Sequence, residues 1–371
     1  MKVLAVHGIG WDKKKLHKEK AVDLWRIKRP IDELKKHVDW QIDELPTFIP
    51  GIEKYKDSDE FTASELENAA EKLGKYDIIW STYFTNPSFY ALLRAVNARY
   101  GTKFVMDVDD DLFSIKEDNP IWAKLTHENV YHMQCMVRDA DYITTTTEEF
   151  AQTLRSKRPD KSATTVMVVP NMIPDSYKHD SIDNGDKTVI GYFGGSSHIN
   201  DLENTCAIEA VEKLMNENKS VEFVACGIPI TKYLPRKRYT YLEGMPSTDF
   251  VDKVFPTLNF DIAIAPLEES IFALGKSNIK WQEATRMGSA FIASGFGPYA
   301  TLPEGTCVLV NNNIEEWYEG LKLLVEDVEL RKKIVTKAQK ELDNYRLEKN
   351  WQVIQKMFEK VGRKKPVLLT L

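Results

Sequence analysis

Three charged residues lie between two short apolar runs in the second half of the sequence. Lys276, Lys280 and Glu283 follow the run 262–265 and precede the run 291–293, and both runs have the pattern of buried parallel strands. At a spacing of i, i+4 and i+7 the three residues share one face if the segment is helical. A cation there can neutralise a diphosphate leaving group, and a carboxylate can accept both hydroxyls of a ribose. A solvated salt-bridge ladder has the same spacing, but the position between buried strands favours a ligand site.

The loop 194–198 is a second candidate site, because it places small residues between a predicted strand at 188–193 and a helix. Free backbone N–H groups at a helix N-terminus favour an anion, so the loop predicts a phosphate site. A tight turn that holds no ligand is the alternative. His198 would donate a hydrogen bond to the phosphate or cap the helix. The two loops together give a predicted ligand-binding set of Gly194, Gly195, Ser196, His198, Ser277 and Glu283.

An acidic cluster, Asp107-Val108-Asp109-Asp110-Asp111, ends another predicted strand. An Asp-x-Asp pair can chelate Mg²⁺ or Mn²⁺, since hard cations prefer carboxylate oxygens, and helix capping with solvation is the alternative. We expect instead that Asp107 or Asp109 lies at a cleft and orients a substrate hydroxyl, without a bound metal. These two aspartates, Lys276 and Lys280 form the predicted catalytic set.

The N-terminal segment 7–10, His-Gly-Ile-Gly, follows a predicted strand at 2–6. Its two glycines, Gly8 and Gly10, let the backbone come close to a ligand or to a following helix. A plain βα turn has the same sequence pattern, so the motif alone does not decide between the two.

Strands alternate with helices along the chain, which predicts βαβ units and mainly parallel sheets. In the first half we expect strands at 2–6, 76–83, 103–108, 142–147 and 164–169, and helices at 21–38, 62–73, 87–100, 123–138 and 148–156. Within 21–38, a kink or a new helix start is expected at Pro30. A polar segment without periodicity, 175–187, predicts a linker. After it we expect strands at 188–193, 221–226, 239–243, 262–265 and 291–293, and helices up to 214 and at 248–258, 314–326, 328–344 and 347–361. Two α/β halves predict two Rossmann-like domains with a cleft between them.

The composition limits the class of protein. A chain of 371 residues with 43% hydrophobic residues is long enough for two packed cores, and its net charge of −6 does not suggest a nucleic-acid substrate. The N-terminus lacks a secretion-signal pattern, and no apolar run approaches about 18 residues. The four cysteines are scattered without a C-x-x-C pair. We therefore expect a cytoplasmic protein without disulfides or a transmembrane segment.

In its order of motifs, the sequence resembles the GT-B glycosyltransferases of the large group 1, or family-4-like, type. The resemblance covers most of the chain. Its elements are the loop 7–10, Arg26 with Pro30, the segments 140–144, 169–171 and 190–194, His198 with 201–202, the segment 261–267, and the segment 276–299 with Lys280, Glu283 and Gly288.

The resemblance implies a hexosyltransferase (EC 2.4) that moves a sugar from a nucleotide sugar to an acceptor. It implies an acceptor-binding domain at 1–180, a nucleotide-sugar-binding domain at 187–345, and a C-terminal helix within 346–371 that returns to the first domain. The ligand-binding set given above then binds the donor, and Glu283 holds its ribose. Neither a cofactor nor a metal is expected, and a UDP-sugar is the expected co-substrate. The residues expected at the acceptor or cleft loop are His7, Gly8, Gly10 and Arg26.

Two departures from the family pattern bear on the chemistry. The usual E-x7-E motif has Gly275 at its first glutamate position, and the usual arginine–lysine pair after the second glycine loop is absent. We expect Lys276 or Lys280 to supply the missing positive charge. The family implies net retention of the anomeric configuration.

Two other functions are compatible with the sequence: a sugar-nucleotide epimerase or hydrolase on the same architecture, and a non-catalytic nucleotide-sugar-binding protein. The acceptor stays open between a glycan, another polymer and DNA, and the oligomeric state stays open too. The basic runs 236–238 and 13–20 would face an anionic acceptor or form solvated surface.

Overall fold

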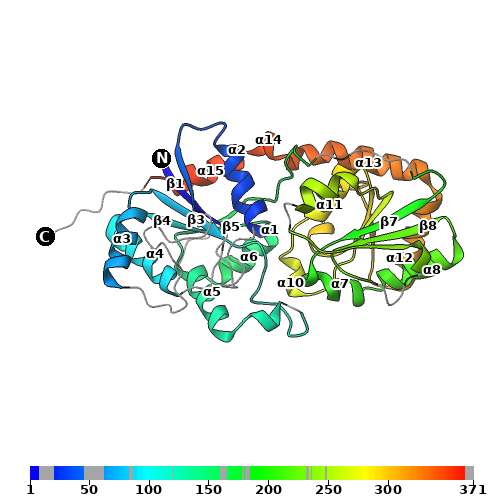
Figure 1. Cartoon of the computed structure of the whole chain (residues 1–371), viewed down its shortest axis with the longest axis horizontal. Helices are drawn as coiled ribbons and strands as arrows, with labels where there is room; N and C mark the ends of the chain where they lie inside the picture. Colours follow the sequence, from blue (N-terminus) through cyan, green and yellow to red (C-terminus); the bar gives the residue numbers. More distant parts are fainter. Residues whose placement is uncertain are drawn as a thin grey trace. The chain divides into compact units, whose positions relative to one another are not determined.

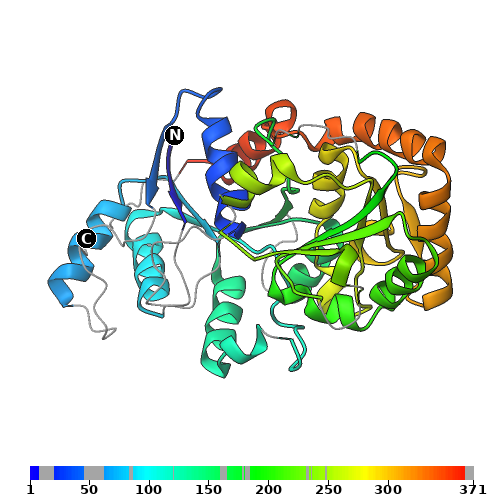
Figure 2. The ribbon, with the colours of Figure 1, turned by 45° about the vertical axis from the view of Figure 1, so that its right-hand side comes forward.

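The computed structural model describes residues 1–7, 21–45, 62–82, 87–119, 121–158, 165–177, 179, 184–230, 234, 236–246 and 249–363. The chain divides into two compact units. The first consists of Met1–Asp110, Leu125–Pro170 and Asn350–Leu371, and the second of Asp111–Lys124 and Asn171–Lys349. Each unit contains a six-stranded parallel sheet with helices on both sides (Figures 1 and 2). The predicted α/β fold with two Rossmann-like units is confirmed.

The sheet of the first unit has the strand order β2-β1-β3-β4-β5-β6. Its strands are β1 (Lys2–Val6), β2 (Gln41–Leu45), β3 (Ile78–Thr82), β4 (Lys103–Asp107), β5 (Tyr142–Thr145) and β6 (Val166–Val168). All neighbours are parallel, with Val3 opposite Ile78 in the pair of β1 and β3. The strand order reverses direction between β1 and β3, and His7 directly follows β1 there. Open α/β sheets bind ligands at such a switch point.

The helices of the first unit begin and end where local chemistry predicts. They are α1 (Ala21–Asp23), α2 (Arg29–Leu34), α3 (Ala63–Leu73), α4 (Pro87–Tyr100), α5 (His127–Asp139), α6 (Glu148–Ser156) and α15 (Gln352–Val361). Thr62 and Glu65 form a reciprocal capping box at the start of α3. Gly101 follows α4 with a φ of 70°, a conformation that favours glycine after a helix end.

The predicted helix 21–38 is divided by a π-helical turn, Leu24–Lys28, between α1 and α2. Pro30 lies in the first positions of α2. Proline cannot donate the backbone bond that a continuous helix needs, and a wider turn just before it accommodates this loss. Of the two predicted alternatives, the structure has a new helix start, at Arg29. The π turn before it carries the buried side chain of Arg26.

The second sheet has the order β12-β11-β10-β7-β8-β9 and is also parallel throughout. Its strands are β7 (Thr188–Phe193), β8 (Val221–Cys226), β9 (Tyr239–Leu242), β10 (Ile262–Ala265), β11 (Ala290–Ser294) and β12 (Val308–Val310). The order reverses between β7 and β10, so the carboxyl ends of these two strands form the switch point of this unit.

Helices of the second unit bury their apolar faces on both sides of this sheet. They are α7 (Ile199–Glu203), α8 (Ala207–Glu217), α10 (Ile271–Leu274), α11 (Ile279–Met287), α12 (Ile314–Glu326), α13 (Val328–Leu342) and, after it, the short α14 (Leu347–Asn350), which runs to the unit boundary. Val211 of α8 and Trp317 of α12 lie in one apolar core with Phe223 of the sheet. Burial of such side chains is the main source of stability here.

The segment 111–124 lies between β4 and α5 in sequence but belongs to the second unit. The side-chain amide of Asn119 donates to the backbone oxygen of Ser197 over 3.2 Å. Lys116 forms an ion pair with Glu268 at 2.6 Å. The second unit is therefore built from two separate stretches of the chain.

Several predictions of secondary structure were wrong. The edge strands β2 and β12 were not predicted, because each is short and mostly half-buried or exposed. The helix predicted up to 214 is divided into α7 and α8 at Cys206, whose φ is 60°. The helix predicted at 248–258 is a π turn, Phe250–Val254, followed by a 3₁₀ turn, Phe255–Thr257.

The last helix, α15, packs on the first unit. The ring of Phe358 meets Trp80 of β3 edge to face at 5.3 Å and Trp40 at 6.2 Å. The predicted return of the C-terminal helix to the first unit is confirmed. Among the described residues, no helix is both long and apolar enough to cross a bilayer.

Candidate functional site

The strongest candidate site lies at the switch point of the second sheet. The loop 194–198 follows β7, and the loop 266–278 connects β10 to α11. Lys280 and Glu283 are on the first turns of α11, and both side chains are buried. Lys276 precedes the helix and lies in the loop, with its ammonium 4.3 Å from the centre of the Phe272 ring. The prediction that all three residues share one helical face was therefore wrong, although all three belong to the same edge of the unit.

Lys280 is held against the end of β7. Its ammonium donates to the backbone oxygen of Phe193 at 2.6 Å and to the hydroxyl of Tyr192 at 3.4 Å. Burial lowers the pKa of Lys280 to about 8, an effect that Asp201 and Glu283 oppose and that Lys276 reinforces. A buried ammonium that is short of compensating charge favours an anionic partner.

Gly194 is required by this lysine. A Cβ atom at this position would lie 2.5 Å from the Tyr192 hydroxyl and 2.7 Å from the Lys280 ammonium. A Cβ at Gly195 would meet nothing within 4 Å. Of the two glycines in the predicted phosphate loop, the first therefore makes room for Lys280 and the second leaves the loop open.

The helix after this loop is shorter than the sequence predicts. A 3₁₀ turn, Ser196–His198, leads into α7, which has five residues. Because few peptide dipoles align in so short a helix, the dipole contributes less to an anion site than predicted. The lysine ammonium groups are the main cationic feature of this edge.

His198 forms a pair with Asp201. The Nδ1 atom of His198 lies 2.7 Å from Oδ2 of Asp201, and Oδ1 of Asp201 accepts the backbone N–H of Glu268 at 2.9 Å. Burial, reinforced by Lys280, lowers the pKa of His198 to about 4 despite the bond to Asp201. Burial alone would raise the pKa of Asp201, but the bonds from His198 and Glu268 lower it overall. His198 makes no side-chain capping bond, so the capping alternative is excluded.

Ser277 is anchored by a residue more than 100 positions away. The amide of Asn171 donates to the hydroxyl of Ser277 at 2.7 Å, and its backbone oxygen accepts from Gln282 at 2.8 Å. Gln282 also donates to Asn278 at 2.8 Å. This network fixes the loop before α11. Sequence reasoning missed Gln282, since a glutamine without a recognisable spacing carries no signal.

The loop after β10 is held from its other side. The hydroxyl of Ser294 accepts the backbone N–H of Leu267 at 2.8 Å, and the amide of Asn312 donates to the backbone oxygen of Leu267 at 2.9 Å. The hydroxyl of Ser294 in turn donates to Asn312 at 2.7 Å. These contacts position Glu268, which bonds Asp201, and they too were missed.

In the first unit Asp107 is fully buried. Its carboxylate accepts two hydrogen bonds from Arg26, each 2.9 Å long, and one from the Thr144 hydroxyl at 2.5 Å. Both oxygens are therefore occupied within the core, which argues against the predicted contact of Asp107 with a substrate hydroxyl. Arg26, predicted at the cleft, is the partner in this interior ion pair. We assign the pair a structural role.

The remaining candidates from the first half of the sequence, of which Asp111 belongs to the second unit, differ in their burial and their partners. Asp109 is half-buried, whereas Asp111 is buried and accepts from Ser114 at 2.7 Å. His7 is nearly buried, with its Nε2 atom 3.3 Å from Glu44. Gly8 and Gly10 lie outside the described residues, as does the basic run 13–20. Within the part of the chain that the structure describes, no three His, Cys, Asp or Glu side chains form a metal-binding group.

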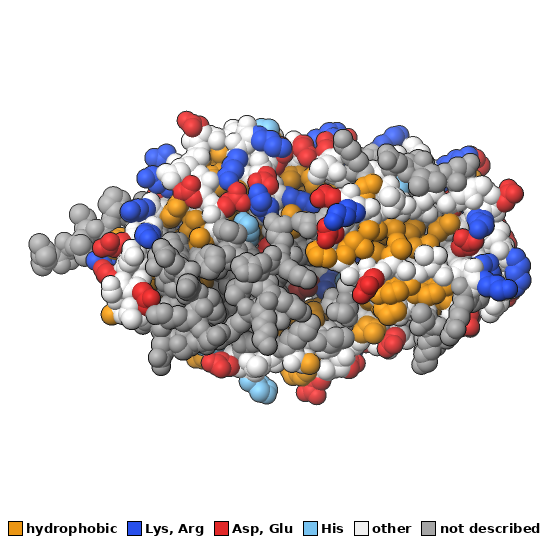
Figure 3. Space-filling model, in the orientation of Figure 1, with side chains coloured by type: hydrophobic (Ala, Val, Ile, Leu, Met, Phe, Trp, Pro, Cys, Tyr) orange, Lys and Arg blue, Asp and Glu red, His pale blue; other side chains and the backbone are white. Residues whose placement is uncertain are grey.

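Arg238 has a structural role in the basic run 236–238. Its guanidinium donates to three backbone oxygens: Met215 and Asn218 at the end of α8, and Val221 at 2.8 Å. A cation at a helix C-terminus is stabilised by the last carbonyls. On the face shown in Figure 3, the described Lys and Arg side chains are interspersed with Asp and Glu. The contacts of Arg238 do not favour an anionic acceptor at this run.

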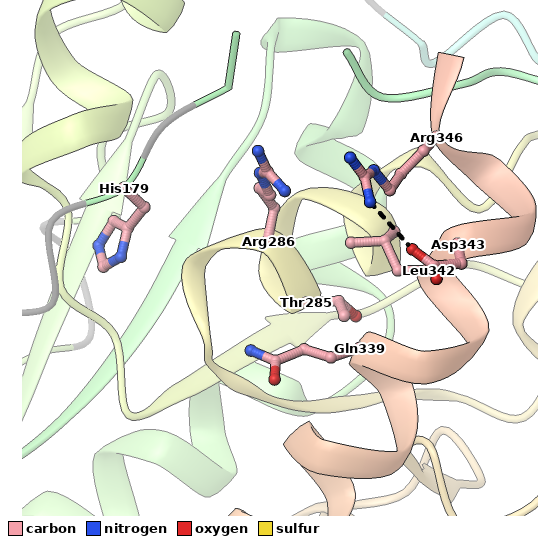
Figure 4. A pocket seen from close by; sticks show the side chains of 7 residues that line it. All are labelled: His179, Thr285, Arg286, Gln339, Leu342, Asp343 and Arg346. Atoms are coloured by element: carbon pink, nitrogen blue, oxygen red, sulfur yellow. Dashed lines mark hydrogen bonds and ion pairs between the residues drawn. The ribbon is translucent and has the colours of Figure 1, made fainter. Parts of the chain in front are cut away.

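A separate hollow of about 540 Å³ lies on the second unit between α11 and α13 (Figure 4). Arg286 on its wall donates to the backbone oxygens of Tyr177 and Asp175, and Arg346 is paired with Asp175 and Asp343. Its lining contains no predicted site residue, and its arginines already have partners. We therefore place the candidate site at the switch point and not in this hollow.

Comparison with known proteins gives a likeness in structure only. No family model matches the sequence, and no curated protein matches it. HepE from Anabaena, solved in complex with UDP-glucose, has a TM-score of 0.66 at 13% identity, and the match covers 98% of this chain and 99% of HepE. Sucrose-phosphate synthase from Thermosynechococcus elongatus has a TM-score of 0.66 at 10% identity, covering 97% and 99%. TarM has a TM-score of 0.58 at 13% identity, covering 80% of this chain, which spans 58% of TarM. These likenesses show that the chain has the GT-B fold.

Proposed function

We propose that this protein is a hexosyltransferase that transfers a sugar from a nucleotide sugar, most simply a UDP-sugar, to an acceptor. The observation that carries the proposal is the placement of Lys280 and Glu283 on α11, at the switch point of the second sheet. The GT-B fold supports it, as does the structure of HepE, which was solved with UDP-glucose. Fold alone does not fix a function, so the residues of the site must carry the argument.

In this proposal Lys280 and Lys276 stabilise the diphosphate that departs when the bond from the sugar carbon to phosphate oxygen breaks. Glu283 accepts the hydroxyls of the ribose, because an ionised carboxylate offers two acceptor oxygens. Lys280 and Lys276 supply the positive charge of the arginine–lysine pair that the sequence lacks. The proposal also includes net retention of the anomeric configuration, independence from metal and a cytoplasmic location. These three parts rest on the family resemblance.

Donor binding tests the proposal most directly. In a thermal-shift screen of UDP-, GDP-, ADP- and TDP-sugars, we expect the sugars of one of these nucleotides to raise the melting temperature of the protein. Glu283→Ala should abolish the shift, whereas Glu315→Ala, at a solvated position on α12, should leave it unchanged. If no nucleotide sugar stabilises the wild-type protein, the proposal is wrong.

Incubation of the donor without acceptor separates the proposal from its rivals. A transferase leaves most of the donor intact until an acceptor is added, whereas an epimerase produces a new sugar nucleotide and a hydrolase releases free sugar. Donor binding without turnover over an acceptor panel of glycans, other polymers and DNA would instead support a binding protein.

Binding of UDP should depend on pH through Lys280. Because its pKa is about 8, the association constant is expected to fall about tenfold per pH unit above 8 as the cation is lost. The ordinary lysine pKa is 10.5, so the unfolded chain binds more protons between pH 8 and 10.5. The contribution of Lys280 to the free energy of unfolding therefore rises with pH in this window. Calorimetric titration from pH 6.5 to 9.5 measures the effect, and Lys280→Met should remove the step at pH 8.

A further inference from the structure

The His198–Asp201 pair has a geometry that suits a neutral ligand group better than a phosphate. We propose that Asp201 fixes the tautomer of His198 so that its Nε2 atom accepts a hydrogen bond from a hydroxyl group of the donor sugar. This makes His198 a specificity-determining residue and Asp201 its positioning residue. The inference rests on the proposed function and changes the role first predicted for His198, which was to donate to phosphate.

Both oxygens of Asp201 are occupied, and this determines which nitrogen of His198 carries the proton. Oδ1 accepts the backbone N–H of Glu268 at 2.9 Å, and Oδ2 lies 2.7 Å from Nδ1 of His198. An ionised carboxylate can only accept hydrogen bonds, so Nδ1 must be the donor. In the neutral ring, Nε2 is then left with a lone pair. The hydroxyl of Thr205 donates to the backbone oxygen of Asp201 at 2.6 Å and holds the aspartate in place.

Burial is the main reason that the His198 ring stays neutral, and two nearby positive charges reinforce it. Lys280 and Lys276 act on the ring as nearby positive charges, and only Asp201 opposes them directly. A second proton on the ring is therefore unfavourable at neutral pH. The sequence spacing of His198 and Asp201, i and i+3, brings them together at the start of α7, and Lys280 is close enough to act on the ring.

The Nε2 atom is available to a ligand. None of the described residues forms a hydrogen bond with it, and 18% of the His198 side chain is exposed. An ionised phosphate oxygen and the unprotonated Nε2 atom are both hydrogen-bond acceptors, so they would repel each other. A hydroxyl group can instead donate a hydrogen bond to Nε2. The two lysines of this edge already provide the cations that a diphosphate needs. A sugar hydroxyl next to the diphosphate is the group that fits Nε2.

Two probes that differ only in the sugar test the assignment: UDP and UDP-glucose, titrated calorimetrically without acceptor. His198→Ala should weaken UDP-glucose about tenfold, the value of one hydrogen bond, and change UDP less than twofold. Lys280→Met should weaken both probes. If His198→Ala weakens the binding of UDP and UDP-glucose equally, His198 contacts the phosphate and the inference is overturned. If the variant weakens the binding of neither probe, the inference is overturned as well.

If the wild-type protein binds neither UDP nor UDP-glucose, the inference is overturned, and so is the part of the proposed function that names a UDP-sugar as the donor. If UDP binds and only the His198→Ala pattern fails, the proposed function stands and the inference does not. The two failures are thus distinguishable.

The role of Asp201 has a spectroscopic test that a merely structural role would not pass. In ¹⁵N-histidine-labelled protein, His198 should show a protonated Nδ1 and a bare Nε2, assigned by the loss of its signals in His198→Ala. Asp201→Asn presents an amide N–H in place of a carboxylate oxygen, so the ring should shift toward the Nε2-protonated tautomer. Binding of UDP-glucose should then weaken more than binding of UDP. A wild-type ring that carries its proton on Nε2 contradicts the proposal.

Discussion

Lys280→Met is expected to lower kcat/KM for the nucleotide-sugar donor by about 10²- to 10³-fold, the loss typical when one fixed stabiliser of a developing charge is removed. Lys280 is buried and fixed by the backbone oxygen of Phe193 at 2.6 Å, so it needs no rearrangement to meet the diphosphate. Methionine keeps nearly the same length and removes only the charge and its hydrogen bonds. Steady-state kinetics with the donor identified in the screen measures the effect.

Two further variants serve as a control and a comparison for Lys280→Met. Lys333→Met changes an exposed lysine of the same unit, on α13, and should leave kcat/KM within about twofold, since surface substitutions are usually near neutral. Lys276→Met should have a smaller effect than Lys280→Met, because Lys276 lies in a loop and not on α11. A folded Lys280→Met protein with nearly unchanged turnover would remove Lys280 from the proposed machinery.

Arg26→Met is expected to lower the free energy of unfolding by about 3–5 kcal/mol, which is the usual effect of leaving a buried charge without its partner. The Arg26 guanidinium makes both of its 2.9 Å bonds to Asp107, and neither side chain is more than 2% exposed. Asp107→Leu should have a similar effect, since it removes the buried carboxylate that accepts both of these bonds. Urea unfolding at neutral pH measures both.

The double variant Arg26→Met with Asp107→Leu is the decisive control. Because it leaves no unpaired charge, its loss of stability should be clearly smaller than the sum of the two single losses. Additive losses would show that the pair is not coupled. Asp107→Asn, where it folds, should keep donor turnover, and a loss of turnover without a loss of stability would return Asp107 to the catalytic set.

The strands that the sequence predicted best are those buried on both faces. The bounds of β7 and β10, which are buried throughout, agree with the predicted runs, because a strand between two helical layers is a mainly apolar segment. The edge strands β2 and β12 lack this signature. At edges, pairing with the neighbouring strand decides the structure, and local sequence does not record it.

The site was predicted where its residues are close in sequence and missed where they are not. Lys280, Glu283 and the loop 194–198 were found from spacing and small residues, but the pairing of His198 with Asp201 was not predicted. Asn171 and Ser277 are 106 positions apart, so no local pattern could pair them. Asp107 was assigned to a substrate because its partner Arg26 is 81 positions away.

The interleaving of the two units along the chain has a consequence for synthesis on the ribosome. The first unit includes 350–371, which are made after every residue of the second unit. Until Phe358 emerges from the exit tunnel, the apolar surface around Trp80 lacks the ring that covers it in the finished protein. The second unit, which ends at Lys349, has all its residues earlier. The C-terminal half of this protein can therefore complete its core first, which reverses the usual order in which domains fold as they are synthesised.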